Sequence, residues 1–177
     1  MEHISYQRNN PHLRRDIIKA GNLLKQFNTA EYHDNVAKLQ ILKNLLGSFE
    51  EGLVIEHNFH CDLGYNIHVG KNFYAGYNCT ILDMAEVKIG DNCLIGPNVG
   101  LYTAGHAVNP LDRHKSGFAR PIRIENNVWI GGHCAILGGI TIGKNAIIAA
   151  GAVVIKDVQE NTIVGGNPAT KIKDIPT

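Results

Sequence analysis

The groups in this chain that could do chemistry near neutral pH are nine histidines, four cysteines and scattered carboxylates. A histidine titrates in that range, so it can act as a general base or bind zinc. His106 is the candidate base because it stands at the start of a polar segment, residues 103–121, that interrupts a regular pattern. A lone histidine is more often solvated or structural. The close histidine pair that a zinc site would need beside this segment is missing, so we expect no bound metal.

The four cysteines have no C-x-x-C spacing. Cys79, Cys93 and Cys134 fall in a row of apolar residues, and Cys61 is six positions before Ile67 in the same phase. We therefore expect small core residues with free thiols, not nucleophiles or metal ligands.

A six-residue repeat after Gly52 supplies the elements that would position these groups. Every sixth residue is apolar in three runs, and a second apolar row lies two positions earlier. Glycine follows many members of the first row, and asparagine comes soon after; both tolerate a positive φ. The pattern predicts stacked coils of short flat strands, with three sides of six residues and an 18-residue turn. The first row is Val69, Ala75, Ile81, Ile89, Ile95, Leu101, Ile124, Ile130, Ile136, Ile142, Ile148 and Val154. The second row is Ile67, Phe73, Cys79, Val87, Cys93, Val99, Ile122, Val128, Cys134, Ile140, Ala146 and Ala152.

The repeat breaks at two places, where we expect function to gather. The step from Ile81 to Ile89 is eight residues, which predicts a bulge that carries Asp83 and Met84. Between Leu101 and Ile124 the phase is lost altogether, and the polar segment 103–121 leaves the coil there.

The N-terminal part has a different period. Apolar residues at helical spacing between Pro11 and Phe49 predict two amphipathic helices that pack on the coil or on a neighbouring subunit. Pro11 suits the first turn of the first helix. Asn28 or Thr29 can end that helix and cap the next, and Gly47 suits a left-handed position after the end of the second helix. We divide the chain into a helical segment, 1–52, and a mainly β coil, 53–177, with the excursion 103–121 and a C-terminal tail.

Composition excludes several classes of protein. The chain has 177 residues and a formal net charge of +1, so it has no general field for nucleic acid or an anionic membrane. No apolar run is long enough to span a bilayer, and the first residues lack the apolar core of a signal peptide. We expect a cytoplasmic protein without nucleic-acid or membrane partners.

Three runs in series carry a resemblance to a known family: TAGHAVNPLDR, PIRIENNVWIGGHCAILGGITIGKNAIIAAGAVVIKDV and VGGNPATKIKDI. With GYNIHVGKNFYAGYNCTILD, the chain resembles the galactoside and maltose O-acetyltransferase family of hexapeptide-repeat acyltransferases over residues 13–175. The resemblance implies a left-handed parallel β-helix behind an N-terminal helical segment. It also implies a homotrimer, with acetyl-CoA bound between neighbouring subunits.

The resemblance also assigns roles. It makes His106 the general base for a sugar hydroxyl, with its imidazole oriented through the other ring nitrogen and a backbone N–H near Gly132 for the oxyanion. Several of these residues have plainer explanations, since the glycines could be corner residues and Asp83 could stabilise its bulge. The coenzyme contacts that it implies are Trp129, Gly131, Gly132, Ala150, Gly151, Lys156, Thr170 and Lys173. The acceptor contacts are Asp62, Tyr74, Asn78 and Asp83.

Departures from the family pattern concern mainly the acceptor. Gly76 replaces a usual Asn, and Met84 replaces an Asp of the galactoside enzymes, which argues against galactoside as acceptor. A usual Glu before Pro121 is missing, and Thr170 stands where Arg is common. Alternatives to an O-acetyltransferase are acetyl transfer to an amino sugar or xenobiotic amine, a non-catalytic trimeric binding or scaffold protein, and a zinc hydratase.

Overall fold

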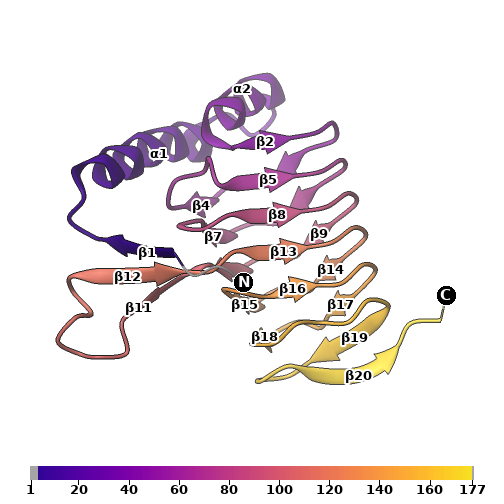
Figure 1. Cartoon of the computed structure of the whole chain (residues 1–177). Coiled ribbons are helices and arrows are strands. Elements are labelled where there is room, and N and C mark those ends of the chain that lie inside the picture. The colour runs from indigo at the N-terminus through magenta and orange to yellow at the C-terminus, as the bar shows by residue number, and fades with distance from the viewer. Residues whose placement is uncertain (1–3, 177) are drawn as a thin grey trace.

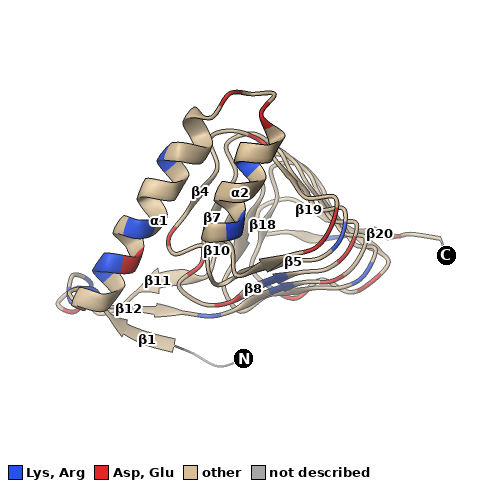
Figure 2. Cartoon of the chain, turned by 90° about the horizontal axis from the view of Figure 1, so that it is seen from above, with Lys and Arg blue, Asp and Glu red and all other residues tan. Residues whose placement is uncertain are grey.

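The two apolar rows wind the chain into stacked triangular coils, closed at one end by two helices (Figures 1 and 2). The computed structural model describes residues 4–176. Every residue of both rows is buried, none more than 5% exposed, so the predicted core is confirmed. The chain passes in turn through three parallel sheets that form the sides of the triangle, so each coil shares its core with the coils above and below.

The three sheets are numbered in the order in which the chain passes through them. Sheet 1 contains β2 (Ser48–Phe49), β5 (Ile67–Val69), β8 (Val87–Ile89), β13 (Ile122–Ile124) and β16 (Thr141–Ile142). Sheet 2 contains β3 (Val54–Ile55), β6 (Tyr74–Ala75), β9 (Leu94–Ile95), β14 (Trp129–Ile130), β17 (Ile147–Ile148), β19 (Thr162–Gly165) and the antiparallel β20 (Thr170–Asp174). Sheet 3 contains β4 (His60–Cys61), β7 (Thr80–Leu82), β10 (Gly100–Tyr102), β15 (Ala135–Leu137) and β18 (Val153–Val154).

The length of one turn changes along the coil. Val69 pairs with Ile89, twenty residues later, whereas Ile124 pairs with Ile142, eighteen residues later. The predicted 18-residue turn is therefore right between β13 and β18 but wrong for the first turns and for the last, where Ile148 pairs with Val164 sixteen residues later. The two extra residues sit at the corner between sheet 3 and sheet 1, where Asp83 and Met84 widen the turn.

Asparagine and glycine serve different purposes at the corners. Asn72, Asn92 and Asn145 have φ values of 53°, 56° and 61°, as predicted. Gly96, which follows the first apolar row, is not in that conformation. A Cβ there would lie 2.6 Å from the backbone nitrogen of Gly132 in the next coil. The reason given for this kind of glycine is therefore wrong: the residue permits close stacking of coils.

The first helix begins at Pro11 and ends at Thr29, as predicted, but the caps of the two helices are other residues. The side chain of Asn10 caps α1 (Pro11–Thr29), and that of Asp34 caps α2 (Asn35–Leu45), each by accepting a backbone N–H. Asn28 caps neither helix; it exchanges two hydrogen bonds with the backbone of Phe59 and so ties α1 to the coil. Gly47 is not left-handed, and a side chain there would collide with the carbonyl oxygen of Tyr65.

A small antiparallel sheet stands apart from the coil. β11 (Ala104–His106) and β12 (Ser116–Ala119) form a hairpin that projects away from it, and β1 (Ile4–Gln7) pairs with β12 along the outer edge (Figure 1). Within residues 4–176, no helix is long and apolar enough to cross a bilayer.

Candidate active site

Buried polar groups hold the corner from which the hairpin leaves the coil, here called the 3–1 corner. The Asp83 side chain is fully buried, and its carboxylate accepts the backbone N–H groups of Asp62, Leu63 and Asn66 at 3.0, 2.8 and 3.3 Å. Burial raises the pKa of Asp83, while these hydrogen bonds act to lower it. The geometry supports the interpretation that Asp83 stabilises its bulge.

His106 lies at the end of β11, exposed and held in one orientation. Its Nδ1–H donates to the carbonyl oxygen of Arg113 at 3.2 Å across the hairpin. Arg113 in turn donates from Nε to Ala107 O at 3.2 Å and from Nη2 to Val108 O at 2.8 Å. A carbonyl oxygen only accepts, so the neutral ring carries its proton on Nδ1 and presents the lone pair of Nε2. This is the tautomer that a general base needs.

Asp62 is half-buried at the same corner. Burial, and secondly the charge of Asp83, raise the pKa of its carboxyl to about 6. Its backbone N–H is used by Asp83, but across residues 4–176 no hydrogen bond to its carboxylate oxygens is found. An acceptor group of this kind is free to take a hydroxyl from a ligand.

The raised pKa of Asp62 predicts a pH-dependent cost to the fold. Because the folded-state pKa lies above the ordinary 3.8, the neutral carboxyl is favoured in the folded state. The contribution of the neutral Asp62 carboxyl to the unfolding free energy is complete below about pH 4 and is lost as the pH rises through 6. Because solvent screens this partly exposed carboxyl, we expect the wild type to lose about 1 kcal/mol more unfolding free energy between pH 4 and pH 8 than Asp62→Asn does.

Urea unfolding of both proteins at the two pH values measures this difference. Glu31→Gln, which neutralises an exposed carboxylate in the turn between α1 and α2, is the control and should follow the wild type. Parallel pH dependences of the wild type and Asp62→Asn would contradict the assignment.

The remaining predicted residues lie elsewhere on the chain. Trp129 is 53% exposed on the outer face of sheet 2, where Tyr74 is half-buried. The others gather at the corner between sheet 2 and sheet 3, here called the 2–3 corner, where Asn78 is exposed with a φ of 61°. The members of this second group are Gly131, Gly132, Ala150 and Gly151.

Backbone contacts distinguish the residues of the 2–3 corner. A Cβ on Gly131 would lie 2.7 Å from the Ala150 nitrogen, and Gly151 has a φ of 76°. The coil itself therefore explains why both positions are glycine, as corner residues. A Cβ on Gly76 would likewise lie 2.9 Å from the backbone nitrogen of Pro97, so a side chain there would need this backbone to shift. Across the described residues, no backbone hydrogen bond is donated by Gly132 N–H or Ala150 N–H. Both N–H groups are therefore free to bind a ligand.

The basic candidates lie toward the C-terminal end of the coil. Lys156 is exposed and lines a pocket of about 240 Å³ together with Lys171, which the sequence analysis did not single out. Thr170 and Lys173 are exposed on β20, and Lys171 is ion-paired with Asp174 at 2.6 Å. A bulge interrupts β20 at Ile172, so Lys173 pairs with Ile163 whereas Lys171 pairs with Val164, and strand alternation does not place the two lysines on one side.

One chain therefore holds two groups of candidate residues. His106, Asp62 and Asp83 share the 3–1 corner, whereas Trp129 and the 2–3 corner lie beyond the width of sheet 3. The chain alone does not bring the coenzyme candidates to the imidazole.

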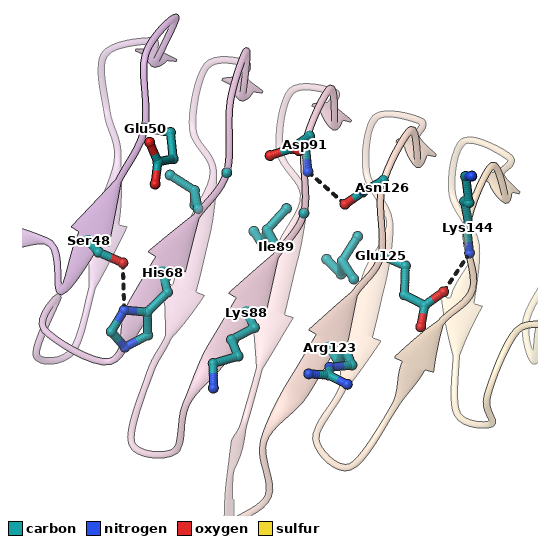
Figure 3. Close-up of a pocket in the computed structure, with 14 residues that line it drawn as sticks. Ser48, Glu50, His68, Lys88, Ile89, Asp91, Arg123, Glu125, Asn126 and Lys144 are labelled. Carbon is teal, nitrogen blue, oxygen red and sulfur yellow. Dashed lines mark hydrogen bonds between the residues drawn. The ribbon is translucent and has the colours of Figure 1, made fainter.

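The outer face of sheet 1 holds a shallow groove of about 530 Å³ that contains none of these residues (Figure 3). Lys88 in this groove pairs with Glu86 at 3.0 Å, and the Asp91 carboxylate accepts the backbone N–H of Lys71 at 2.8 Å. Ser48 bonds His68, and the Lys144 N–H donates to Glu125 at 3.1 Å. Within residues 4–176, no cluster of three His, Cys, Asp or Glu side chains suits a metal.

Family models and relatives match this chain. The family described as bacterial transferase hexapeptide (six repeats) matches residues 121–156, and the hexapeptide repeat of succinyl-transferase matches 86–105. The galactoside O-acetyltransferase of Escherichia coli strain K12 is 38% identical over 159 residues, which cover 89% of this chain and 78% of that protein.

Two solved structures superpose on nearly the whole chain. A galactoside acetyltransferase in complex with coenzyme A has a TM-score of 0.94 at 36% identity, with 97% of this chain and 86% of the other covered. A maltose O-acetyltransferase from Clostridium difficile 630 has a TM-score of 0.94 at 40% identity, with 98% and 93% covered. The predicted left-handed parallel β-helix behind an N-terminal helical segment is confirmed. The chain belongs to the galactoside and maltose O-acetyltransferase family of hexapeptide-repeat acyltransferases.

Proposed function

We propose that this protein transfers the acetyl group of acetyl-CoA to a hydroxyl of a sugar or similar small acceptor, with His106 as general base. The observation that carries the proposal is the orientation of His106, whose Nδ1–H is bonded to Arg113 O while Nε2 stays open. Nε2 takes the proton of the acceptor hydroxyl as its oxygen attacks the thioester carbonyl. The C–S bond of the tetrahedral intermediate then breaks, and the imidazolium returns the proton to the thiolate.

The 2–3 corner supplies the donor side of this reaction. The free N–H of Gly132 is suited to the oxyanion, and the exposed Trp129 ring forms a wall for the extended pantetheine arm. Gly131, Ala150 and Gly151 leave room for that arm beside the backbone. Lys156, Thr170 and Lys173 are the proposed phosphate contacts at the end of the coil. A solved relative that contains coenzyme A supports this use of the fold.

We further propose a homotrimer with its active sites between subunits. Cross-strand pairing aligns one outward row on sheet 2, and every member is apolar or aromatic; the matching row on sheet 1 is polar or charged. An exposed apolar stripe of this length is typical of a subunit interface. A second copy seated there would bring a 3–1 corner to a 2–3 corner. The sheet 2 row is Val54, Tyr74, Leu94, Trp129, Ile147 and Ile163. The sheet 1 row is Ser48, His68, Lys88, Arg123 and Thr141.

On the acceptor side, Asp62 offers a carboxylate without a hydrogen bond from residues 4–176, and Asp83 holds the backbone of Asp62 in place. Tyr74 and Asn78 lie on sheet 2 and at the 2–3 corner, so they would reach the acceptor from the neighbouring subunit. Met84 offers no hydrogen-bond donor or acceptor of comparable strength.

Thiol release from acetyl-CoA measures the proposed reaction directly. We expect acceptor-dependent release with some members of a panel of hexoses, disaccharides and the matching amino sugars, above a blank without acceptor. Faster release with amino sugars than with the matching hydroxyl sugars would favour acetyl transfer to nitrogen. No release with any acceptor, together with no calorimetric binding of acetyl-CoA, would support the scaffold alternative instead.

A further inference from the structure

Tyr6 stands apart from the rest of β1. It is the one half-buried residue of the strand, whereas Ile4, Ser5 and Gln7 are exposed. β1 pairs with β12 so that Tyr6 lies opposite Gly117, and β11 pairs with β12 so that His106 also lies opposite Gly117. Directly opposed residues of antiparallel strands project from the same face of a sheet. Tyr6 and His106 therefore share one face, on either side of a residue without a side chain.

The missing side chain of Gly117 determines where the phenol lies. A Cβ on Gly117 would lie 2.5 Å from both Cζ and Oη of Tyr6. The ring thus folds back over the glycine, and its hydroxyl end lies over the strand that separates it from the imidazole. Any other residue at position 117 would push the hydroxyl away.

Asp62 completes the group. It lies at the 3–1 corner from which the hairpin leaves the coil, with its backbone N–H bonded to Asp83. Burial, and secondly the charge of Asp62, raise the pKa of Tyr6, in keeping with that placement. Within residues 4–176, neither the Tyr6 hydroxyl nor the Asp62 carboxylate has a hydrogen-bond partner. A donor, an acceptor and a basic nitrogen, all open, therefore converge beside the hairpin.

We propose that Tyr6 is a specificity-determining residue of the acceptor site: its hydroxyl and the Asp62 carboxylate together bind the hydroxyls beside the one that reacts at His106. This inference rests on the proposed function. The phenol donates to one hydroxyl oxygen, and the carboxylate accepts from the hydroxyl of the adjacent carbon. The pair fits a polyhydroxylated acceptor with neighbouring hydroxyls, such as a pyranose, and discriminates against a simple alcohol. Such convergent polar groups fix the orientation of a ligand.

Steady-state kinetics of Tyr6→Phe test the inference. The variant keeps the ring and loses the hydroxyl, so we expect about a tenfold rise in the KM for methyl glucopyranoside, with kcat and the KM for acetyl-CoA nearly unchanged. We also compare each enzyme's rate on the 2-, 3- and 4-deoxy analogues with its rate on the parent sugar. One analogue should react more slowly than the parent sugar with the wild type but equally fast with Tyr6→Phe, because that analogue lacks the hydroxyl that Tyr6 binds. A merely structural role would weaken all acceptors equally.

The matched control is Tyr65→Phe, which removes a phenol bonded to the Asp16 carboxylate at 3.2 Å on the helical segment. It should behave as wild type. An unchanged acceptor KM in Tyr6→Phe would overturn the inference while the wild type still acetylates sugars.

A second measurement does not depend on turnover. In an ultraviolet titration of the tyrosines, the component that Tyr6→Phe removes should shift to lower pH in Asp62→Asn, because the carboxylate charge that opposes ionisation is gone. A component that does not shift would overturn the pairing. If the wild type acetylates no sugar, the proposed function fails and the acceptor assignment with it, while the titration still reports on the pair.

Discussion

We expect His106→Ala to lower the rate of acetyl transfer by about a thousandfold, while the coil stays folded and acetyl-CoA still binds. A sugar hydroxyl is almost wholly protonated at neutral pH, so it attacks a thioester slowly unless a base removes its proton in the transition state. Within the described hairpin, the imidazole of His106 is fixed through Nδ1 with Nε2 open. The exposed His106 side chain makes no core packing, so its loss should lower the rate of acetyl transfer and leave the unfolding free energy nearly unchanged.

Three measurements separate this prediction from its alternatives. Thiol release gives the rate, calorimetry gives the affinity for acetyl-CoA, and light scattering gives the mass of the assembly. His114→Ala is the matched control, since His114 is an exposed histidine between the strands of the same hairpin. It should keep the wild-type rate. A folded His106→Ala protein that transfers acetyl at the wild-type rate would remove His106 as the base.

The coil was predictable because its physical constraint repeats. An inward position recurs with each short side, so an apolar residue at every sixth position reports the fold many times over. The length of each turn was less predictable. The bulge at Asp83 is visible in the sequence only as an eight-residue step. The same step occurs one turn earlier, from Cys61 to Val69, but Cys61 also stands six positions before Ile67, so its predicted phase is wrong: it pairs with Ile81 of the first row. Likewise, Gly96 and a left-handed glycine look alike in a sequence, although stacking explains one and φ the other.

The candidate site was predictable residue by residue but not as an arrangement. His106 drew notice because the repeat fails beside it. The periodicity gave no sign of Arg113, whose guanidinium bonds to Ala107 and Val108 inside an irregular loop. Tyr6 was missed because β1 is a four-residue edge strand whose partner is more than a hundred residues away. The one available signal was its aromatic type in an otherwise polar stretch. Contacts between distant segments carry no period.

The separation of the two groups of residues leads to a sharper test of where the active site lies. We expect Ala150→Trp to lower acetyl transfer by about a hundredfold, because Ala150 is exposed at the 2–3 corner and an indole there displaces the coenzyme from its reacting position. His106→Ala removes the base at the 3–1 corner. Each variant alone is therefore inactive for a different reason, and neither change touches the core.

Mixed trimers of these two variants should recover activity. Suppose that every site takes its hairpin from one subunit and its 2–3 corner from the next. A site is then intact when the hairpin comes from an Ala150→Trp subunit, which keeps His106, and the 2–3 corner comes from a His106→Ala subunit, which keeps Ala150. Every mixed trimer contains one intact interface in three, so mixed trimers freed of homotrimers should show about a third of the wild-type rate. Differently tagged copies, purified through both tags in turn, ensure that only mixed assemblies are assayed. The control is the double variant with both changes in one chain, prepared from two differently tagged copies in the same way. It should stay inactive. If mixed assemblies also stay inactive, each site is built within one chain, and the apolar row on sheet 2 needs another explanation.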